Sequence, residues 1–496
     1  MSDLIETTAL EATALPDVPL RLLIGGEWCE AASGKRFATL NPATEEVLAE
    51  VSEAEAPEID AAVAAARDAL RRGAWPGMTG AERGRILYRL AGILRERAEE
   101  VVLLESTDGG KPLAATRRMD VPAAIDCLEY YAGWADKLAG EVVPTRRDAL
   151  TYINRVPVGV VAAIVPWNFP LMNAVWKIAP ALACGCTVVL KPAELTPLSA
   201  LWLGRAALEA GLPPGVLNIV AGFGATAGAA LVSHPGIDKI AFTGSPQTGQ
   251  FIMRAAAEHV TRIGLELGGK SPSVVFADAD LEAAVRQTAS GAYFNAGQVC
   301  SAATRVIVQD SVHDAFVDGL AQRAKKLRLG NPLEDGVSMG PLISEKQMER
   351  VLGYIESGRR EGAEAVCGGE RAGNAGYFVQ PTVFADVSPG MTISQEEIFG
   401  PVVSVLRFSD EEEAINLANG TDYSLAAAVW TNDINRGHRV SQRLDAGTVW
   451  VNTYGPTDTR LPWGGMGGKS GIGRDLGRAA LDNYTEQKTV WVQMRT

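Results

Sequence analysis

The chain has 496 residues and is acidic, with 46 Lys and Arg against 59 Asp and Glu and a formal net charge of −13. This balance argues against a nucleic-acid backbone as a partner, because phosphate binding depends on clustered cations. The length exceeds what one hydrophobic core usually serves, so we expect at least two domains. Every strongly apolar run is interrupted too early to cross a bilayer, so we expect no membrane association.

The N-terminal segment and the cysteines indicate the compartment. Residues 1–20 carry four acidic side chains and no Lys or Arg, which fits neither a secretory signal nor a mitochondrial transit peptide. We predict a flexible acidic tail there. The six cysteines are too sparse for a disulfide or zinc framework, so no metal site is expected. Cys184 and Cys186 are predicted to pack in an apolar core, and the expected location is the reducing cytoplasm.

The first ordered part combines long helices with a parallel sheet. Apolar residues recur at three- and four-residue spacing over residues 57–72 and 80–107, which predicts two amphipathic helices. Short β-rich runs then alternate with helical connections. Strands that are apolar throughout are typical of a parallel sheet covered on both faces. We therefore predict a doubly wound, Rossmann-like α/β domain over 21–137 and 158–267, with strands at 158–165, 187–190, 216–220, 238–242 and 263–267.

A second alternation of strands and helices predicts a second α/β domain over residues 268–470. Its strands are expected at 273–276, 305–308, 402–408, 425–430 and 447–452. Its helices are expected at 281–294, 312–327, 346–362 and 411–419. Two β-prone segments, 140–157 and 484–494, lack a hydrophobic face large enough to stand alone. We expect both to pair with another part of the structure.

The strands of the first domain end in residues suited to a dinucleotide. In an open α/β sheet, ligands bind beyond the carboxyl ends of the strands. Lys191 and Glu194 follow one strand and offer a cation and a carboxylate to a ribose. Gly244 and Ser245 precede a predicted helix, whose free N–H groups and dipole favour a pyrophosphate.

Each of these features also has a structural explanation. Lys191 could be a surface lysine, and Glu194 could cap the next helix. The spacing Gly222-x-Gly224 arises easily by chance in a chain with 52 glycines. No single feature decides between the two explanations, but their occurrence at four strand ends favours a dinucleotide site.

Cys300 lies in a polar, Gly-containing loop, within the run Phe-Asn-Ala-Gly-Gln-Val-Cys-Ser over 294–301. A lone cysteine is more often an inert core residue than a nucleophile. This run, however, resembles the active-site segment of the aldehyde dehydrogenase superfamily. The run Leu-Glu-Leu-Gly-Gly-Lys over 265–270 is similar to that family's glutamate motif. Residues 166–170, 191–194, 242–245 and 396–401 also resemble its motifs, and the resemblance covers about residues 23–492.

The resemblance implies a hydrolytic enzyme that oxidises an aldehyde to its acid. Cys300 would attack the carbonyl carbon, while the side-chain NH₂ of Asn168 and the Cys300 backbone N–H would hold the oxyanion. Hydride loss to a nicotinamide would leave a thioester, which Glu266 would hydrolyse as general base. Glu266 could instead form a buried salt bridge with Lys177. The family suggests that Lys177 tunes Glu266 or relays protons.

The resemblance also implies NAD as the cofactor. The Glu194 carboxylate would repel a 2′-phosphate, which favours NAD, although relatives with this glutamate also use NADP. The contacts it implies are Lys191 and Glu194 at the adenine ribose, Trp167 and Ser245 near the pyrophosphate, Glu397 at the nicotinamide ribose and Phe399 against the ring, with Gly224 and Gly244 also binding the cofactor.

The sequence is compatible with several classes of aldehyde substrate. The resemblance places Phe169, Trp176 and Trp463 along the substrate tunnel, where aromatic rings favour a cationic betaine-type or amino aldehyde. A generic apolar tunnel for aliphatic or aromatic aldehydes is an equal alternative, and Arg460 would favour an acidic semialdehyde. The loop over 464–469 is predicted to be one residue longer than the family's Gly-Gly loop.

Two other functions fit the same fold. A coenzyme-A-acylating enzyme is disfavoured because such relatives generally lack the glutamate at the position of Glu266. A non-catalytic structural protein, as among lens crystallins, is disfavoured by the joint presence of Cys300, Glu266 and Asn168. The family further implies a homodimer or homotetramer, in which residues 138–157 and 480–496 form an oligomerisation arm.

Overall fold

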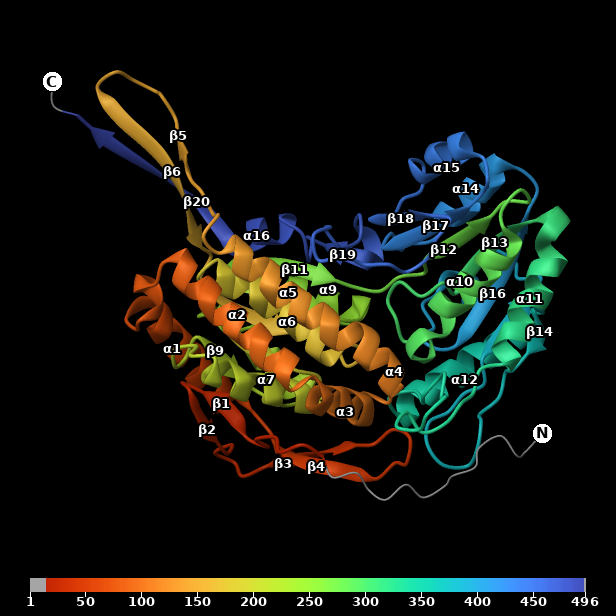
Figure 1. Cartoon of the computed structure of the whole chain (residues 1–496), viewed down its shortest axis with the longest axis horizontal. Coiled ribbons are helices and arrows are strands. Elements are labelled where there is room, and N and C mark those ends of the chain that lie inside the picture. The colour runs from red at the N-terminus through yellow and green to blue at the C-terminus, as the bar shows by residue number, and fades with distance from the viewer. Residues whose placement is uncertain (1–14, 495–496) are drawn as a thin grey trace.

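The computed structural model describes residues 15–494 and contains two large β-sheets, each covered by helices on both faces (Figure 1). The predicted doubly wound α/β fold is confirmed. The first sheet has the order β19 (Gly471–Ile472), β11 (Arg262–Glu266), β10 (Lys239–Thr243), β7 (Val160–Ile164), β8 (Thr187–Lys191), β9 (Leu217–Ile219), β1 (Leu22–Ile24) and β2 (Glu27–Cys29).

The winding of the first sheet reverses between β7 and β10. From β7 the chain passes through α6 (Pro170–Ala183) to β8 and through α7 (Leu198–Glu209) to β9. After the short α8 (Ala229–Val232), β10 instead leads through α9 (Pro246–His259) to β11 on the other side. The five central strands are parallel, so all their carboxyl ends lie on one edge. Such a reversal opens a crevice at that edge.

The second sheet has the same kind of topology. Its order is β14 (Glu364–Cys367), β15 (Thr382–Ala385), β16 (Val402–Phe408), β13 (Arg305–Gln309), β12 (Pro272–Val275), β17 (Ala426–Trp430) and β18 (Thr448–Val451). Only β14 runs antiparallel to its neighbour. The covering helices are α10 (Leu281–Tyr293), α11 (His313–Lys325), α12 (Glu345–Arg360), α13 (Thr392–Gln395), α14 (Glu411–Asn419) and α15 (Ile434–Ser441).

The helix predicted over 80–107 is two helices, α2 (Gly80–Glu96) and α3 (Ala98–Gly109). The single-helix prediction was wrong because Arg97, with φ −110° and ψ 29°, interrupts the helical backbone. The halves pack on different partners, α2 on α5 (Val121–Trp134) and α3 on α7. No glycine or proline marks the break. The other predicted helix is α1 (Ala56–Arg71), and the short α4 (Leu113–Ala115) precedes a π-helical turn over Thr116–Asp120.

Four N-terminal strands were not predicted. Gly25 and Gly26, both with positive φ, form the tight turn between β1 and β2, and this Gly-Gly pair is a hairpin signal in the sequence. The other pair is β3 (Arg36–Leu40) with β4 (Val47–Ser52). The predicted flexible tail falls partly outside the described residues. Its last part packs on the core through Leu15, Val18 and Leu20.

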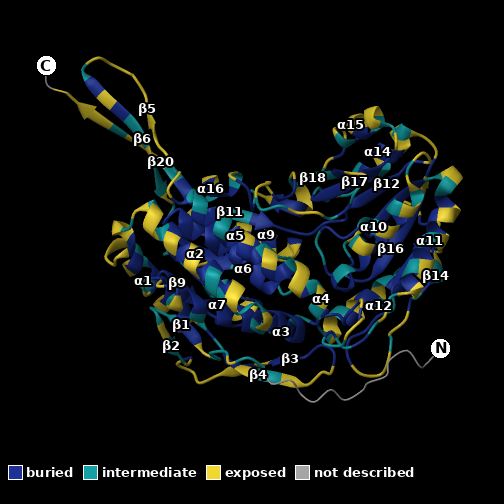
Figure 2. Cartoon of the chain, in the orientation of Figure 1, coloured by how far each residue is buried: buried dark blue, intermediate teal, exposed yellow. Residues whose placement is uncertain are grey.

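A three-stranded sheet projects from the body of the molecule (Figure 1). Strand β6 (Ala149–Pro157) pairs antiparallel with β5 (Glu141–Val142) on one side and β20 (Thr485–Gln493) on the other; β20 directly follows α16 (Ala479–Tyr484). The two β-prone segments therefore pair with each other. Exposed residues dominate β5 and β20, unlike the buried strands of the two large sheets (Figure 2).

The six cysteines are free thiols, and Cys184 and Cys186 are buried as predicted. Over residues 15–494, no helix combines the length and apolar character needed to cross a bilayer. The same part of the chain holds no group of three His, Cys, Asp or Glu side chains arranged for a metal ion.

Candidate active site

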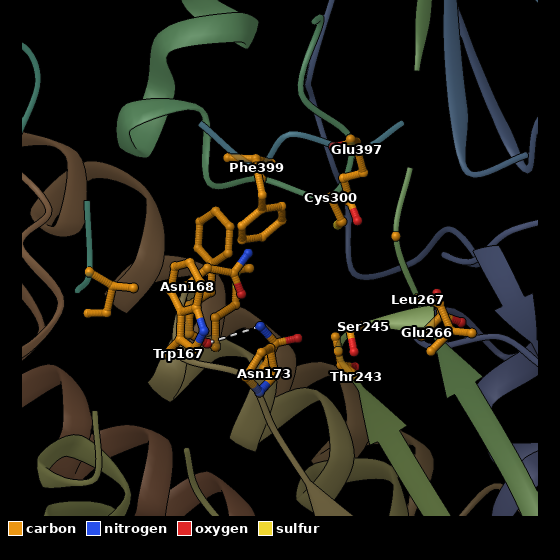
Figure 3. Close-up of a pocket in the computed structure, with 18 of the residues that line it drawn as sticks. Trp167, Asn168, Asn173, Thr243, Ser245, Glu266, Leu267, Cys300, Glu397 and Phe399 are labelled. Atoms are coloured by element: carbon orange, nitrogen blue, oxygen red, sulfur yellow. Dashed lines mark hydrogen bonds between the residues drawn. The ribbon is translucent and has the colours of Figure 1, made fainter. Parts of the chain in front are cut away.

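A cavity of about 1080 Å³ lies between the two sheets. The first sheet contributes residues that follow its strands, such as Asn168 after β7 and Ser245 after β10. The second sheet contributes residues that precede its strands, such as Cys300 before β13 and Glu397 before β16. Figure 3 shows these side chains around one open space.

The Cys300 loop has an unusual backbone. Asn295, Ala296 and Gly297 take φ values of 50°, 52° and 72°, in the left-handed region. Such a conformation costs roughly 1–3 kcal/mol for a non-glycine residue, so the surroundings must hold it. Asn295 Nδ2 donates to the Asn168 carbonyl at 3.0 Å, and Gln298 Oε1 accepts the Ile343 N–H at 2.9 Å. These bonds fix the loop, and with it Cys300, against both sheets.

Asn168 presents a side-chain amide beside this loop. Its Nδ2 donates to the Gln298 carbonyl at 2.9 Å, which leaves the second N–H of the amide for another acceptor. Burial raises the pKa of the Cys300 thiol, and the nearby backbone N–H groups of Cys300 and Ser301 oppose this rise. Together these groups form a set of donors suited to a negative oxygen next to the Cys300 sulfur.

Glu266 is the last residue of β11, and its carboxyl is buried. Its Oε2 has no hydrogen-bond partner within residues 15–494. Burial and the Asp475 carboxylate raise its pKa well above the ordinary value, while Lys177 and Arg474 oppose this rise. A carboxyl of this kind is a candidate general acid or base.

Lys177 forms a salt bridge with Asp475 rather than with Glu266. Its Nζ lies 2.5 Å from Asp475 Oδ2, and the lysine side chain is 1% exposed. The alternative of a Glu266–Lys177 salt bridge was therefore wrong, because Asp475 in the returning C-terminal segment neutralises the lysine. Asp475 was missed in the sequence, where nothing marks a carboxylate 298 residues away as the partner. Lys177 does not line the cavity, and it acts on Glu266 only through charge.

The surroundings of Cys300 favour the protonated form of its thiol. Withdrawal from water, followed by the Glu397 and Glu266 carboxylates, raises its pKa to about 12. Glu397 accepts a hydrogen bond from the Gly269 N–H at 2.9 Å, and burial raises its pKa to about 7. A thiolate nucleophile therefore requires a group that removes the proton. Glu266 lines the same cavity, and its Oε2 has no hydrogen-bond partner within residues 15–494.

The segment containing Glu397 and Phe399 is held by two residues of α12 that the sequence analysis missed. Gln347 Nε2 donates to the Phe399 carbonyl at 2.8 Å, and Arg350 Nη2 donates to the Glu397 carbonyl at 2.8 Å. Both also line the cavity. Phe399 takes a φ of 60°, and its ring meets Trp167 edge-on with centroids 5.3 Å apart. The amphipathic helix was visible in the sequence, but its cavity-facing side was not.

The other end of the cavity fits a dinucleotide. Ser245 caps the N-terminus of α9, where its Oγ accepts the Thr248 N–H at 3.3 Å, and the helix dipole there favours an anion. Thr243 Oγ1 is buried nearby without a partner in the described chain. Glu194 lines the cavity, and Lys191 lies behind it with an Nζ–Oε2 distance of 3.7 Å. Burial lowers the pKa of Lys191.

Aromatic side chains line the part of the cavity that extends past Cys300. Phe169 stacks on Phe294 with centroids 6.2 Å apart, and Trp176 meets Trp463 edge-on at 6.3 Å. Trp463 precedes Gly464, whose φ of 145° suits glycine. A Cβ at Gly464 would lie 2.5 Å from Glu266 Oε1, so this loop packs directly on the carboxyl. Whether the loop is one residue longer than usual stays a prediction.

Most of the predicted site residues lie together. Three do not line the cavity: Lys177, Lys191 and Gly224. Gly224 begins a π-helical turn whose Gly228 lies against the Lys191 side chain. The residues that do line it are Cys300, Glu266, Asn168, Trp167, Glu194, Gly244, Ser245, Glu397, Phe399, Phe169, Trp176 and Trp463.

This fold and cavity define an α/β oxidoreductase of the dinucleotide-dependent type. The model of the aldehyde dehydrogenase family matches residues 28–490. Aldehyde dehydrogenase 1A1 of Mesocricetus auratus is 48% identical over 497 residues, which cover 98% of this chain and 99% of the relative. The chain therefore belongs to the aldehyde dehydrogenase family, and the resemblance seen in the sequence is confirmed.

Solved structures agree over nearly the whole length. The NAD⁺ complex of an aldehyde dehydrogenase from Bacillus cereus has a TM-score of 0.95 and 51% identity, covering 97% of each chain. An indole-3-acetaldehyde dehydrogenase from P. syringae, solved as a mutant with NAD⁺ and IAA, has a TM-score of 0.94 and 44% identity, covering 97% of each chain.

Proposed function

We propose that this protein oxidises an aldehyde to its carboxylic acid with reduction of NAD, through a thioester on Cys300. The observation that carries the proposal is the arrangement of Cys300, Asn168 and Glu266 around one cavity that continues to the N-terminus of α9. A nucleophile, an oxyanion donor and a base are the groups that this chemistry needs.

The first step forms a bond between the Cys300 sulfur and the aldehyde carbon. The thiol proton leaves toward Glu266, directly or through one water, because Oε2 of this carboxyl has no partner within residues 15–494 and the residue borders the same space. The carbonyl oxygen becomes an oxyanion, which accepts from the free N–H of Asn168 and the Cys300 backbone N–H. Removing one such donor typically costs about 3–4 kcal/mol.

The residues of the adjoining cleft would orient the cofactor. Ser245 and the N–H groups of α9 fit its pyrophosphate, Glu194 its adenine ribose, and Glu397 with Phe399 its nicotinamide end. When bound, NAD accepts the hydride that the adduct on Cys300 loses. Glu266 releases the thiol proton to solvent and then takes a proton from water as the water attacks the thioester. It passes this second proton to the departing sulfur, so the acid leaves and the thiol is restored.

The direct test is NADH formation with a panel of aldehydes in the absence of coenzyme A. We expect turnover that does not depend on coenzyme A and is higher with NAD than with NADP, because the Glu194 carboxylate repels a 2′-phosphate. An absolute requirement for coenzyme A would identify the acylating alternative. No NADH with any aldehyde under reducing conditions would favour the non-catalytic alternative.

The remaining proposals concern the setting of this activity. We place the protein in the cytoplasm as a homodimer or homotetramer, with residues 138–157 and 480–496 as the oligomerisation arm. The exposed edges of β5 and β20 support this, because unpaired strand edges readily take up another strand. We also propose that the dinucleotide-binding domain ends at about residue 267 and that the catalytic domain extends from there to about residue 470.

A further inference from the structure

A carboxamide lies among the aromatic side chains of the substrate tunnel. Asn173 belongs to α6 and lines the cavity, although its residue is only 5% exposed. Trp176 follows it by three positions, on the same side of the helix. The Phe169–Phe294 and Trp176–Trp463 pairs line the same cavity as Asn173.

The orientation of this carboxamide is fixed by the helix itself. Asn173 Nδ2 donates to the Phe169 carbonyl at 3.1 Å, and a carbonyl can pair only with the NH₂ side of the amide. Oδ1 must therefore face the other way. Figure 3 shows the Asn173 amide with its nitrogen bonded to that carbonyl and its oxygen pointing into the cavity.

The oxygen is an unused acceptor. No donor within residues 15–494 bonds Asn173 Oδ1, while the Phe169 carbonyl accepts the backbone N–H and one side-chain N–H of this residue. A ligand that shields a buried acceptor from water without donating a hydrogen bond to it loses about 1–3 kcal/mol of binding free energy. This loss corresponds to a factor of about 5 to 150 in affinity or kcat/KM. An apolar aldehyde that fills the tunnel would pay this cost, whereas one with a correctly placed donor would not.

The surroundings favour a neutral donor on an aromatic ring. The aromatic pairs that line the same cavity suit a flat ring, whose edge then meets Oδ1. Asp475, which also lines the cavity, does not offer a free charge to a cation, because it is paired with Lys177. We propose that Asn173 selects aryl aldehydes that carry a hydroxyl or N–H donor on the ring, an inference that rests on the proposed aldehyde oxidation.

The test compares pairs of substrates that differ only in the donor. kcat/KM is measured for phenylacetaldehydes with a hydroxyl or a methyl group at ring positions 2, 3 and 4, with unsubstituted phenylacetaldehyde and acetaldehyde as references. At one ring position at least, the wild-type protein should prefer the hydroxyl compound by about tenfold or more. In Asn173→Leu, which keeps the size and removes the acceptor, this ratio should fall to near one. Met172→Leu, on the same wall, should keep the ratio.

Turnover without a hydroxyl preference at any position overturns the role of Asn173 and leaves the proposed activity intact. A preference that survives in Asn173→Leu overturns it as well. Absence of NADH with every aldehyde, acetaldehyde included, contradicts the proposed function instead. Wild-type ratios near one at every position overturn the proposal even if Asn173→Leu fails to fold. In that case Asn173→Ala replaces it as the variant without the acceptor.

Discussion

The two large sheets have similar topologies but present opposite ends to the cavity. Strands β7, β10 and β11 end there, whereas β12, β13 and β16 begin there. The carboxyl ends lead into α6 and α9, whose N-terminal N–H groups suit anions such as a pyrophosphate. The amino ends are reached through irregular segments, in which Asn295, Ala296 and Phe399 adopt positive φ. In the proposed function, helix termini would serve binding and the strained Asn295–Ala296 loop would position the nucleophile.

The largest effect should come from the strained loop of the second sheet. Cys300→Ala removes the nucleophile and should lower kcat by roughly 10⁴-fold or more. Binding of NAD to the first sheet should persist, because Ser245 and Glu194 are untouched. The measurement pairs steady-state kinetics with the NAD-dependent rise in melting temperature. Loss of both turnover and the NAD-dependent rise in melting temperature would contradict a division in which the first sheet binds NAD and the second provides the nucleophile.

Glu266 is an exception to this division between the two sheets. It ends a strand of the first sheet, but its proposed role is in hydrolysis of the thioester. Glu266→Gln should reduce steady turnover by about 10²–10⁴-fold, the usual contribution of a general base. A first turnover of NADH should remain as a burst in stopped-flow absorbance. It should be slower than in the wild-type protein, because Glu266 also takes the thiol proton, but still faster than hydrolysis. Gln keeps the size of the side chain, so the melting temperature serves as the control. Undiminished steady turnover would remove Glu266 from the hydrolytic step.

Substitution of Glu194 tests cofactor binding by the first sheet separately from the chemical steps. Glu194→Gln removes the negative charge and keeps the shape, so the ratio of kcat/KM for NADP to that for NAD should rise by about tenfold. The rate of aldehyde oxidation at saturating NAD should change little. Both cofactors are compared by initial-rate kinetics with one aldehyde. An unchanged ratio would place the adenine ribose elsewhere.

The smallest effects concern the pair behind Glu266. Catalysis by the Glu266 carboxylate rises with pH through its pKa. Asp475 raises that pKa, so Asp475→Asn should move the rising limb of the pH–rate profile to lower pH. Lys177 lowers it, so Lys177→Met should move the limb to higher pH. Shifts in the same direction for both variants would show that the limb belongs to another group.

The sequence predicted site residues that lie in contiguous motifs, but it did not predict contacts between residues far apart in the chain. The strand-end motifs and the Cys300 run are contiguous, so their residues could be assigned before the structure. Asp475 could not, because its pairing with Lys177 depends on β19 returning to β11 at the edge of the first sheet. The sequence also did not show that the cavity lies at the amino ends of the strands of the second sheet. The break at Arg97 followed from packing on two different helices, which no local residue signals.

The central claim is the thioester on Cys300, and trapping it is the most direct measurement. Glu266→Gln is mixed with NAD and an aldehyde, quenched in acid within the first turnover, digested and examined by mass spectrometry. The account predicts about one NADH per active site and an acyl group on the peptide that contains Cys300. An NADH burst with Cys300 unmodified, or with the acyl group on another cysteine such as Cys29, would contradict it.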